Sequence, residues 1–242
     1  MKITSYNISR FRGNYKKGCN LPEVREHNMR RLLEFIDKEG LLQSAEDIII
    51  LQEVPYRQNQ TPINKLFKDV FSKYEIIEPL IETRKSQSAV VALVKKNSNW
   101  KRVETENTKF TYEKISTVNK VLELEHKETK ETILNLHITD DKVWDCLSDT
   151  LESHKYTYIV GDLNAHNNEH RPEDKRSPEK LKMFTDKGYK DLVPDNYVTF
   201  YSAKTTVDHM YYNTEQVKAD EEDFSLIPIN ISDHACLVYR AQ

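Results

Sequence analysis

The chain has 242 residues, a length that favours one large domain over two small ones, so we predict a single domain over residues 1–242. Hydrophobic residues make up 38% of the chain, enough to bury one core, and charged residues make up 31%, as on a well-solvated surface. The formal charge of −3 argues against binding a polyanion through bulk charge alone. Any contact with nucleic acid is therefore expected to be local.

Membrane and redox features are sparse in this sequence. No apolar run approaches the roughly 18 residues that span a bilayer, and the N-terminal segment MKITSYNISRF has no apolar signal-peptide core. Cys19, Cys146 and Cys236 are widely spaced and form no C-x-x-C pair, which indicates free thiols rather than a zinc site. We expect a cytoplasmic protein with no membrane span, with export by a route that the sequence does not show as the alternative, and no obligate protein partner is evident.

The first quarter of the chain predicts a strand, a helix and a second strand. Residues 2–8 alternate as a strand does, and residues 21–40 form an amphipathic helix with Pro22 near its start. Residues 47–51, DIIIL, suit a strand buried on both faces that stops at Gln52 and Glu53. The carboxylate of Glu53 is thus expected at the end of a strand.

The rest of the chain predicts mostly short strands. Five of these should form an antiparallel meander at residues 74–81, 88–95, 100–106, 117–125 and 132–139. A helix at 141–153 leads to a strand at 156–160, and further strands are predicted at 197–201, 207–212 and 235–239. The charged stretch 171–182 is typical of a solvated loop, with local phosphate contacts as the alternative. Because several strands end in polar clusters, we expect the site at one rim of two sheets.

Four groups of residues, most of them at strand ends, could carry out phosphodiester chemistry. Glu53 is a natural partner for a hard cation such as Mg²⁺, although a surface ion pair is the plainer interpretation. In YIVGDLNAH, Asp162 and Asn164 face one way if the extended conformation continues, so a carboxylate and an amide could position water. An Asx-turn formed by the same two residues is the alternative.

Two histidines complete this set. Asp208 could hold His234 in one tautomer and raise its basicity, which would make His234 mostly cationic. The alternative for His234 is a cap or a surface pair. His137 ends the run TILNLHIT and could donate to a phosphate oxygen, although a histidine at a strand end is more often structural.

The order of these motifs resembles the signature of the endonuclease/exonuclease/phosphatase superfamily, which includes deoxyribonuclease I. The matching segments are SYN, LQEV, LHI, VGDLNAH, VDHM and SDHA. The resemblance implies an α/β (α+β) fold, a four-layer αββα sandwich of two mostly antiparallel sheets flanked by helices. It also implies Mg²⁺-dependent hydrolysis of phosphodiesters, with Mn²⁺ as the alternative ion.

The resemblance further implies a role for each matched residue. Glu53 would bind the metal, with Asn7 and Asp233 in support. Asp162 and Asn164 would position the attacking water, His234 with Asp208 would stabilise the phosphate or protonate the leaving oxygen, and His137 would contact a phosphate oxygen. The choice of Asp162 or His234 as proton acceptor stays open at this point.

DNA cleavage by an endonuclease is the predicted activity. His137 distinguishes the chain from the abasic-site endonucleases, which usually carry Tyr there, and GDLNAH resembles the endonuclease domains of some retrotransposons. Tyr56, Arg57 and Arg84 are predicted to contact the nucleic acid, with an exposed loop pair as the alternative for Tyr56 and Arg57. Two alternatives are a phosphatase or phosphodiesterase acting on a small-molecule or lipid phosphoester, and a catalytically silent binding protein.

Overall fold

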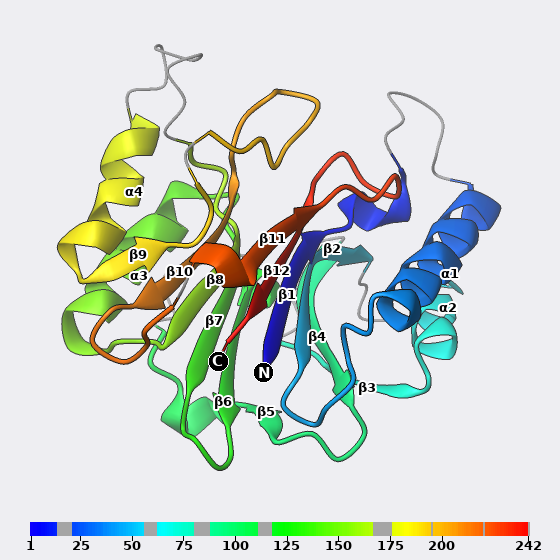
Figure 1. Ribbon diagram of the computed structural model, residues 1–242, viewed down its shortest axis with the longest axis horizontal. Coiled ribbons are helices and arrows are strands. Elements are labelled where there is room, and N and C mark those ends of the chain that lie inside the picture. Colours follow the sequence, from blue (N-terminus) through cyan, green and yellow to red (C-terminus); the bar gives the residue numbers. More distant parts are fainter. Residues whose placement is uncertain are drawn as a thin grey trace.

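Two six-stranded sheets pack face to face, with helices on the outer face of each, in a computed structural model of the chain (Figure 1). The residues that the structure describes are 1–13, 21–55, 62–79, 88–110, 118–166, 176–194, 196–219 and 221–241. Helices α1 and α2 cover one sheet, and α3 and α4 cover the other (Figure 1). The predicted four-layer αββα sandwich is therefore confirmed.

The first sheet contains both the first and the last strand of the chain. Its order is β11 (Phe224–Ile227), β12 (Cys236–Arg240), β1 (Lys2–Asn7), β2 (Ile48–Pro55), β4 (Ser88–Lys95) and β3 (Tyr74–Ile77). Only the β1–β2 pair is parallel among these neighbours. Its outer face is covered by α1 (Pro22–Lys38) and α2 (Pro62–Val70).

The second sheet repeats this arrangement with one parallel pair, β7–β8. Its order is β5 (Trp100–Arg102), β6 (Val121–His126), β7 (Thr132–His137), β8 (Tyr158–Asp162), β10 (Asp208–Asn213) and β9 (Tyr189–Asp191). Its outer face is covered by α3 (Asp141–Ser153) and α4 (Arg176–Asp186). Short 3₁₀ helices are η1 (Ser9–Phe11), η2 (Thr105–Asn107), η4 (Val118–Lys120) and η5 (Glu221–Asp223).

The apolar runs explain why both faces of the central strands are buried. In β2, Ile48 and Ile50 face the other sheet, whereas Ile49 and Leu51 face the helices. This alternation follows from the two-residue period of a strand. Residues of both sheets form one core between them. The packing of this core sets how the strand ends of one sheet lie relative to those of the other.

Strand β2 is longer than predicted, and Glu53 lies within it. The strand reaches Pro55 because its pairing with β4 resumes at Val54 after a register shift. At this irregularity Glu53 has a φ of 55°, so its side chain leaves the regular alternation of the strand. The predicted strand end at Gln52 and Glu53 is wrong, and the reason is a β-bulge.

The predicted meander is divided between the sheets. Strands β3 and β4 belong to the first sheet and β5, β6 and β7 to the second, so the chain crosses over between β4 and β5. The strand predicted at 197–201 is absent, and Phe200 instead makes isolated bridges to Thr205 and His234. These bridges bring the loop before β10 to the segment before β12.

Several other elements differ from the predictions. The charged stretch continues into helix α4 from Arg176, because apolar Leu181 and Phe184 within it pack on the second sheet. Helix α2 and strands β9 and β11 were not predicted from the sequence. Strands β9 and β11 are short and lie at sheet edges, where pairing on one side leaves a weak sequence pattern.

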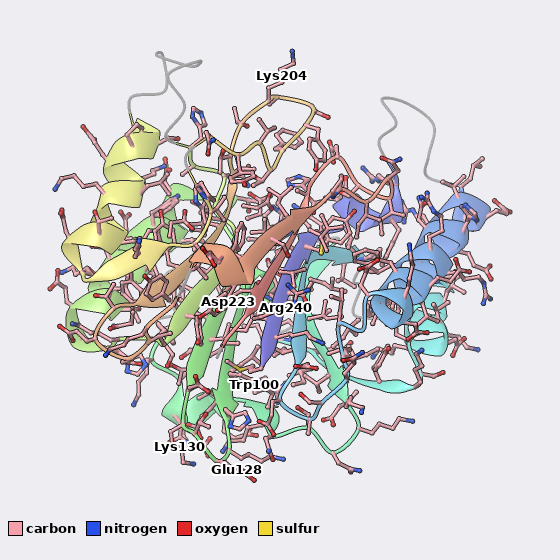
Figure 2. All side chains as sticks on the ribbon, in the orientation of Figure 1. Trp100, Glu128, Lys130, Lys204, Asp223 and Arg240 are labelled. Carbon is pink, nitrogen blue, oxygen red and sulfur yellow. The ribbon has the colours of Figure 1, made fainter. Side chains whose placement is uncertain are left out.

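Different loops lie at the two ends of the sandwich. Figure 2 shows Lys204, in the loop before β10, at one end, and Glu128 and Lys130, beyond β6, at the other.

Among the described helices, none is long and apolar enough to cross a membrane. Cys146 and Cys236 are buried free thiols, as predicted, while Cys19 lies outside the described residues.

Candidate active site

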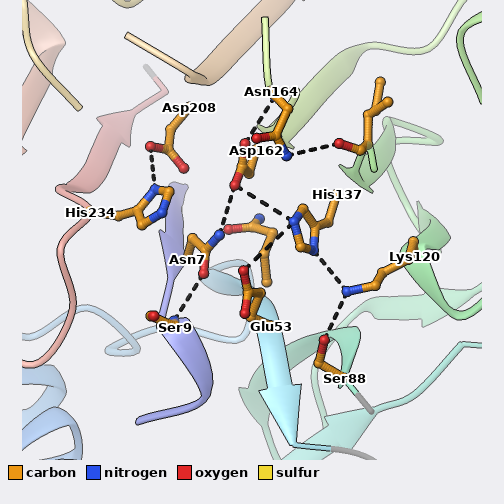
Figure 3. Close-up of polar contacts among 12 residues, drawn as sticks. Asn7, Ser9, Glu53, Ser88, Lys120, His137, Asp162, Asn164, Asp208 and His234 are labelled. Carbon is orange, nitrogen blue, oxygen red and sulfur yellow. Dashed lines mark hydrogen bonds and ion pairs between the residues drawn. The ribbon is translucent and has the colours of Figure 1, made fainter. Parts of the chain in front are cut away.

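Polar residues from both sheets meet at the end of the sandwich where β1, β7 and β8 terminate (Figure 3). Within the second sheet, the register pairs Asp162 with His137 on one side and with Asp208 on the other. The first sheet contributes Asn7, the last residue of β1, and His234, which precedes β12. Each of the eight catalytic and metal-binding residues predicted from the sequence thus lies within 4.0 Å of at least one other member of that set.

Asn7 and Asp162 join the two sheets. Asn7 Nδ2 donates to Asp162 Oδ2 at 2.8 Å, and Asn7 Oδ1 accepts from the Ser9 amide at 2.9 Å. Asp162 is buried, and burial followed by the nearby charge of Asp208 raises its pKa to about 7. The cation of His234 and the hydrogen bonds from Asn164 and Asn7 oppose this rise without cancelling it. Asp162 is therefore a stronger base than an ordinary carboxylate.

The GDLN segment turns immediately after Asp162. Gly161 has a φ of 140°, and a Cβ there would lie 1.9 Å from the Leu136 carbonyl oxygen, so glycine is required. Asn164 has a φ of 49°, its amide N–H donates to Asp162 Oδ1 at 3.0 Å, and its Nδ2 donates to the Ile138 carbonyl at 2.8 Å. The Asx-turn is thus formed, and the extended conformation does not continue to Asn164.

His234 and Asp208 form a buried pair, as the sequence predicted. His234 Nδ1 lies 2.8 Å from Asp208 Oδ2, and the imidazole stacks on Phe200 with ring centroids 4.7 Å apart. Burial alone would lower the pKa of His234, but Asp208, Asp162 and Asp233 together raise it to about 10. His234 is therefore an imidazolium at neutral pH.

Asp233 lies on the other side of His234. Its Oδ1 is 4.0 Å from His234 Nε2, and its Oδ2 accepts from the Ser202 hydroxyl at 3.0 Å. Among the described residues its contacts thus run to His234 and Ser202 rather than to Glu53. The expected pairing of Asp233 with Glu53 around one metal stays a prediction.

Glu53 and His137 face each other across the junction of the sheets. His137 Nε2 lies 3.8 Å from Glu53 Oε1 and 3.7 Å from Asp162 Oδ2. Glu53 Oε2 is also 3.3 Å from the Nε of Arg10, a residue of η1 with a φ of 56°. Glu53 is the more accessible of these carboxylates, since 23% of its side chain is exposed against 3% for Asp162.

The donor set fits a hard divalent cation. Asp162, Asp208 and His234 offer ligand atoms within 4.8 Å of one another. One carboxylate oxygen each of Asp208 and Asp233 is buried without a hydrogen-bond partner among the described residues, and carboxylate oxygens are ligands that Mg²⁺ prefers. His234 itself is a poor ligand in this state, because its Nδ1 is paired with Asp208 and the ring is protonated.

Among the described residues, Arg10, Lys120 and Phe200 contact residues of the site but were not identified from the sequence. Lys120 contacts His137, and nothing in TVNKVLELEH distinguishes it from a surface lysine. Arg10 and Phe200 lie in irregular segments, where periodicity carries no signal. Tyr56, Arg57 and Arg84, the predicted substrate contacts, lie outside the described residues.

Known structures share this architecture. One is the endonuclease domain of TRAS1, a telomere-specific non-LTR retrotransposon, at 13% identity and a TM-score of 0.61, covering 100% of this chain and 97% of that one. Another is the 3′ phosphatase NExo from Neisseria, bound to a product DNA hairpin, at 12% identity and a TM-score of 0.62, covering 100% and 99%. A third is an endonuclease/exonuclease/phosphatase from Bacteroides vulgatus, at 13% identity and a TM-score of 0.59, covering 100% and 98%.

Comparison of the sequence itself gives no relative: no protein-family model matches it, and no curated protein does. The likeness to solved structures extends over the whole chain at identities of 12 to 13%. It therefore concerns the fold, which is the fold that the motifs SYN to SDHA implied. The chain has the fold of the endonuclease/exonuclease/phosphatase proteins.

Proposed function

We propose that the chain is a Mg²⁺-dependent phosphodiester hydrolase that cleaves DNA as an endonuclease. The observation that carries the proposal is the buried cluster of Asp162, Asp208 and His234, which Asn7 ties to the first sheet. Burying two carboxylates beside an imidazolium is costly for folding alone, and such clusters are typical of catalytic sites.

The protonation states favour a division of roles within this cluster. His234 already carries its proton at neutral pH, so it is suited to protonate the leaving oxygen or to stabilise charge on the phosphate. Asp162 has a pKa raised to about 7, which suits a proton acceptor for the attacking water. We infer that Asp162, rather than His234, is the base, and that Asn164 helps to orient the water.

The remaining site residues would bind the metal and the phosphate. Glu53 would hold Mg²⁺, with Asn7 and Asp233 as further oxygen donors, and His137 would donate to a phosphate oxygen. When bound, the ion would supply positive charge that offsets the negative charge on the phosphate. The accessible carboxylate of Glu53 supports this assignment, as does Asp233 Oδ1, which accepts no hydrogen bond from the described residues.

Two observations support DNA as the substrate. The similar TRAS1 structure is described as an endonuclease domain, and NExo is bound to a DNA hairpin. Positive charge is also clustered near Glu53. Arg10 pairs with Glu53, and Arg12 and Arg10 are close enough to Arg25 that their charges, together with burial as the largest cause, lower the pKa of Arg25. Clustered guanidinium groups bind backbone phosphates, so the overall charge of −3 does not oppose binding at this place.

Nicking of supercoiled plasmid tests the proposal. The purified chain should nick plasmid with Mg²⁺, and EDTA should abolish the nicking. Asp162→Asn should reduce the rate at least about 100-fold, the effect expected for a lost general base. Asp186→Asn is the matched control, because Asp186 is exposed and pairs only with Lys182 four residues away among the described contacts.

A substrate panel distinguishes this activity from the alternatives. Plasmid, RNA, abasic DNA, a 3′-phosphorylated oligonucleotide, an inositol phosphate and a phospholipid would be compared at equal enzyme concentration. Turnover of a phosphate monoester or phospholipid without plasmid nicking would contradict the endonuclease proposal and favour a small-molecule or lipid phosphoesterase. Binding without turnover of any substrate would indicate a silent binding protein.

A further inference from the structure

A buried lysine contacts the ring of His137 (Figure 3). Lys120 is only 5% exposed, and its Nζ lies 2.9 Å from His137 Nδ1 and 2.8 Å from Ser88 Oγ. Lysine is almost never buried unless it is paired. Here the direct partners given by these contacts are an imidazole and a hydroxyl. Burial lowers the pKa of Lys120 to about 8, against the more distant charges of Glu53 and Asp162, so the group is still mainly an ammonium at pH 7.

The residue next to Lys120 in the sequence helps to hold the lysine in place. Asn119 donates from Nδ2 to the Ser88 carbonyl at 2.7 Å, so two consecutive residues of η4 form hydrogen bonds with the first residue of β4. Ser88 in turn pairs with Pro55 of β2, two residues beyond Glu53. The ammonium group is therefore fixed relative to both sheets.

Hydrogen-bond chemistry determines what this contact does to His137. An ammonium group has donors and no acceptor, so Nδ1 of the ring has to accept, and the single ring proton is left on Nε2. Nε2 is the nitrogen that faces the catalytic carboxylates, 3.7 Å from Asp162 Oδ2. Burial and then the charge of Lys120 lower the pKa of His137 well below its ordinary value, in agreement with a neutral ring.

The two histidines of the site therefore have opposite partners. Asp208 accepts from His234 Nδ1 and favours an imidazolium, whereas Lys120 donates to His137 Nδ1 and favours a neutral imidazole. A second cation at His137 would also be repelled by His234 and Arg10, whose charges both lower the pKa of His137. The site thus separates a charged donor from a neutral one.

We propose that Lys120 is a positioning residue that fixes His137 as the neutral tautomer protonated on Nε2, and so directs one N–H toward the phosphate of the substrate. The contact of His137 with phosphate rests on the proposed function, but the tautomer does not. The tautomer can therefore be measured without substrate or metal.

Nitrogen NMR of the full chain tests the tautomer directly. In protein labelled with ¹⁵N-histidine, long-range proton–nitrogen correlation distinguishes protonated from unprotonated ring nitrogens, and His137→Gln assigns the signals. We expect His137 to show a protonated Nε2 and an unprotonated Nδ1 at pH 7, while His234 shows two protonated nitrogens. A proton on Nδ1 of His137 would overturn the proposal.

Substitution of Lys120 then tests its cause. Lys120→Met removes the donor, so the ring should populate both tautomers, and kcat should fall about 10- to 100-fold with a smaller change in KM, as for other partners that orient a catalytic histidine. Lys120→Arg keeps a donor and should restore the single tautomer. Ser88→Ala keeps the contact with His137 and should leave the tautomer unchanged.

Lys155→Met is the matched control, because Lys155 is a solvent-exposed lysine paired with Glu215. A Lys120→Met variant that keeps the single Nε2–H tautomer would refute the role of Lys120. Circular dichroism shows whether that variant folds. If it does not, the nitrogen NMR spectrum of the unmodified chain still decides the tautomer. An unmodified chain that shows the expected tautomer but hydrolyses no phosphoester would refute the proposed function and leave the tautomer assignment intact.

Discussion

Asp208→Asn should change the charge of His234 while keeping the hydrogen bond between them. The asparagine oxygen can still accept from Nδ1, which lies 2.8 Å from the present carboxylate, so mainly the negative charge is lost. With charge centres about 4 Å apart and an effective dielectric constant of about 20, that charge contributes about 4 kcal/mol, or about three pKa units. The pKa of His234 should therefore fall from about 10 to about 7 or below, since the burial that lowers it stays.

NMR titration of the His234 ring in metal-free protein measures this change. Asp233→Asn should produce a smaller decrease, because that carboxylate lies 4.0 Å from Nε2 and its side chain is 24% exposed. Asp186→Asn, at an exposed surface pair, should leave the His234 pKa unchanged. A pKa in Asp208→Asn within about half a unit of the original would refute the electrostatic account, because Coulomb's law requires a larger change.

Three further predictions concern stability. Gly161→Ala should lower the free energy of unfolding by about 3 kcal/mol, roughly 6 to 12 °C in thermal melts, because its Cβ would meet the Leu136 carbonyl at 1.9 Å; an unchanged melting temperature would contradict this. Asp191→Ala should cost about 3 kcal/mol in urea unfolding, since it removes the carboxylate that pairs with Nδ1 of buried His209, and a loss below about 1 kcal/mol would contradict the pairing. The raised pKa of His234 contributes stability that is fully present below about pH 6.5 and is lost as the pH rises toward 10. The free energy of unfolding in urea should therefore decline over that pH range, and it should decline less in the Asp208→Asn variant.

The elements with strong periodicity could be predicted from the sequence. The helix Asp141–Ser153 and the strand Ser88–Lys95 have the predicted bounds, because each presents a regular apolar pattern to a covering layer. The allocation of strands to sheets could not be predicted. It depends on the crossover between β4 and β5, and alternation within a strand does not encode which strand lies beside it.

The site was predictable where residues end regular strands. Asn7, His137 and Asp162 close β1, β7 and β8, so the register that buries those strands also aligns their last residues. It was not predictable where the backbone is irregular. The bulge at Glu53 and the turn at Asn164 both use positive φ at residues other than glycine, which tertiary contacts impose and composition does not reveal.

The distances within the site depend on how the two sheets are registered, and a polar contact beneath it helps to set that register. Gln52 is fully buried between the sheets, and its Nε2 donates at 3.1 Å both to Ser5 Oγ in the first sheet and to Asn135 Oδ1 in the second. Apolar side chains alone would tolerate small sliding of one sheet over the other, whereas buried hydrogen bonds have a narrow range of distance and angle. Since Gln52 pairs in register with Asn7, this contact lies directly behind the bond that joins Asn7 to Asp162. The precision of a site assembled from two sheets is thus linked to a polar group in the core, which a purely apolar residue at position 52 would not supply.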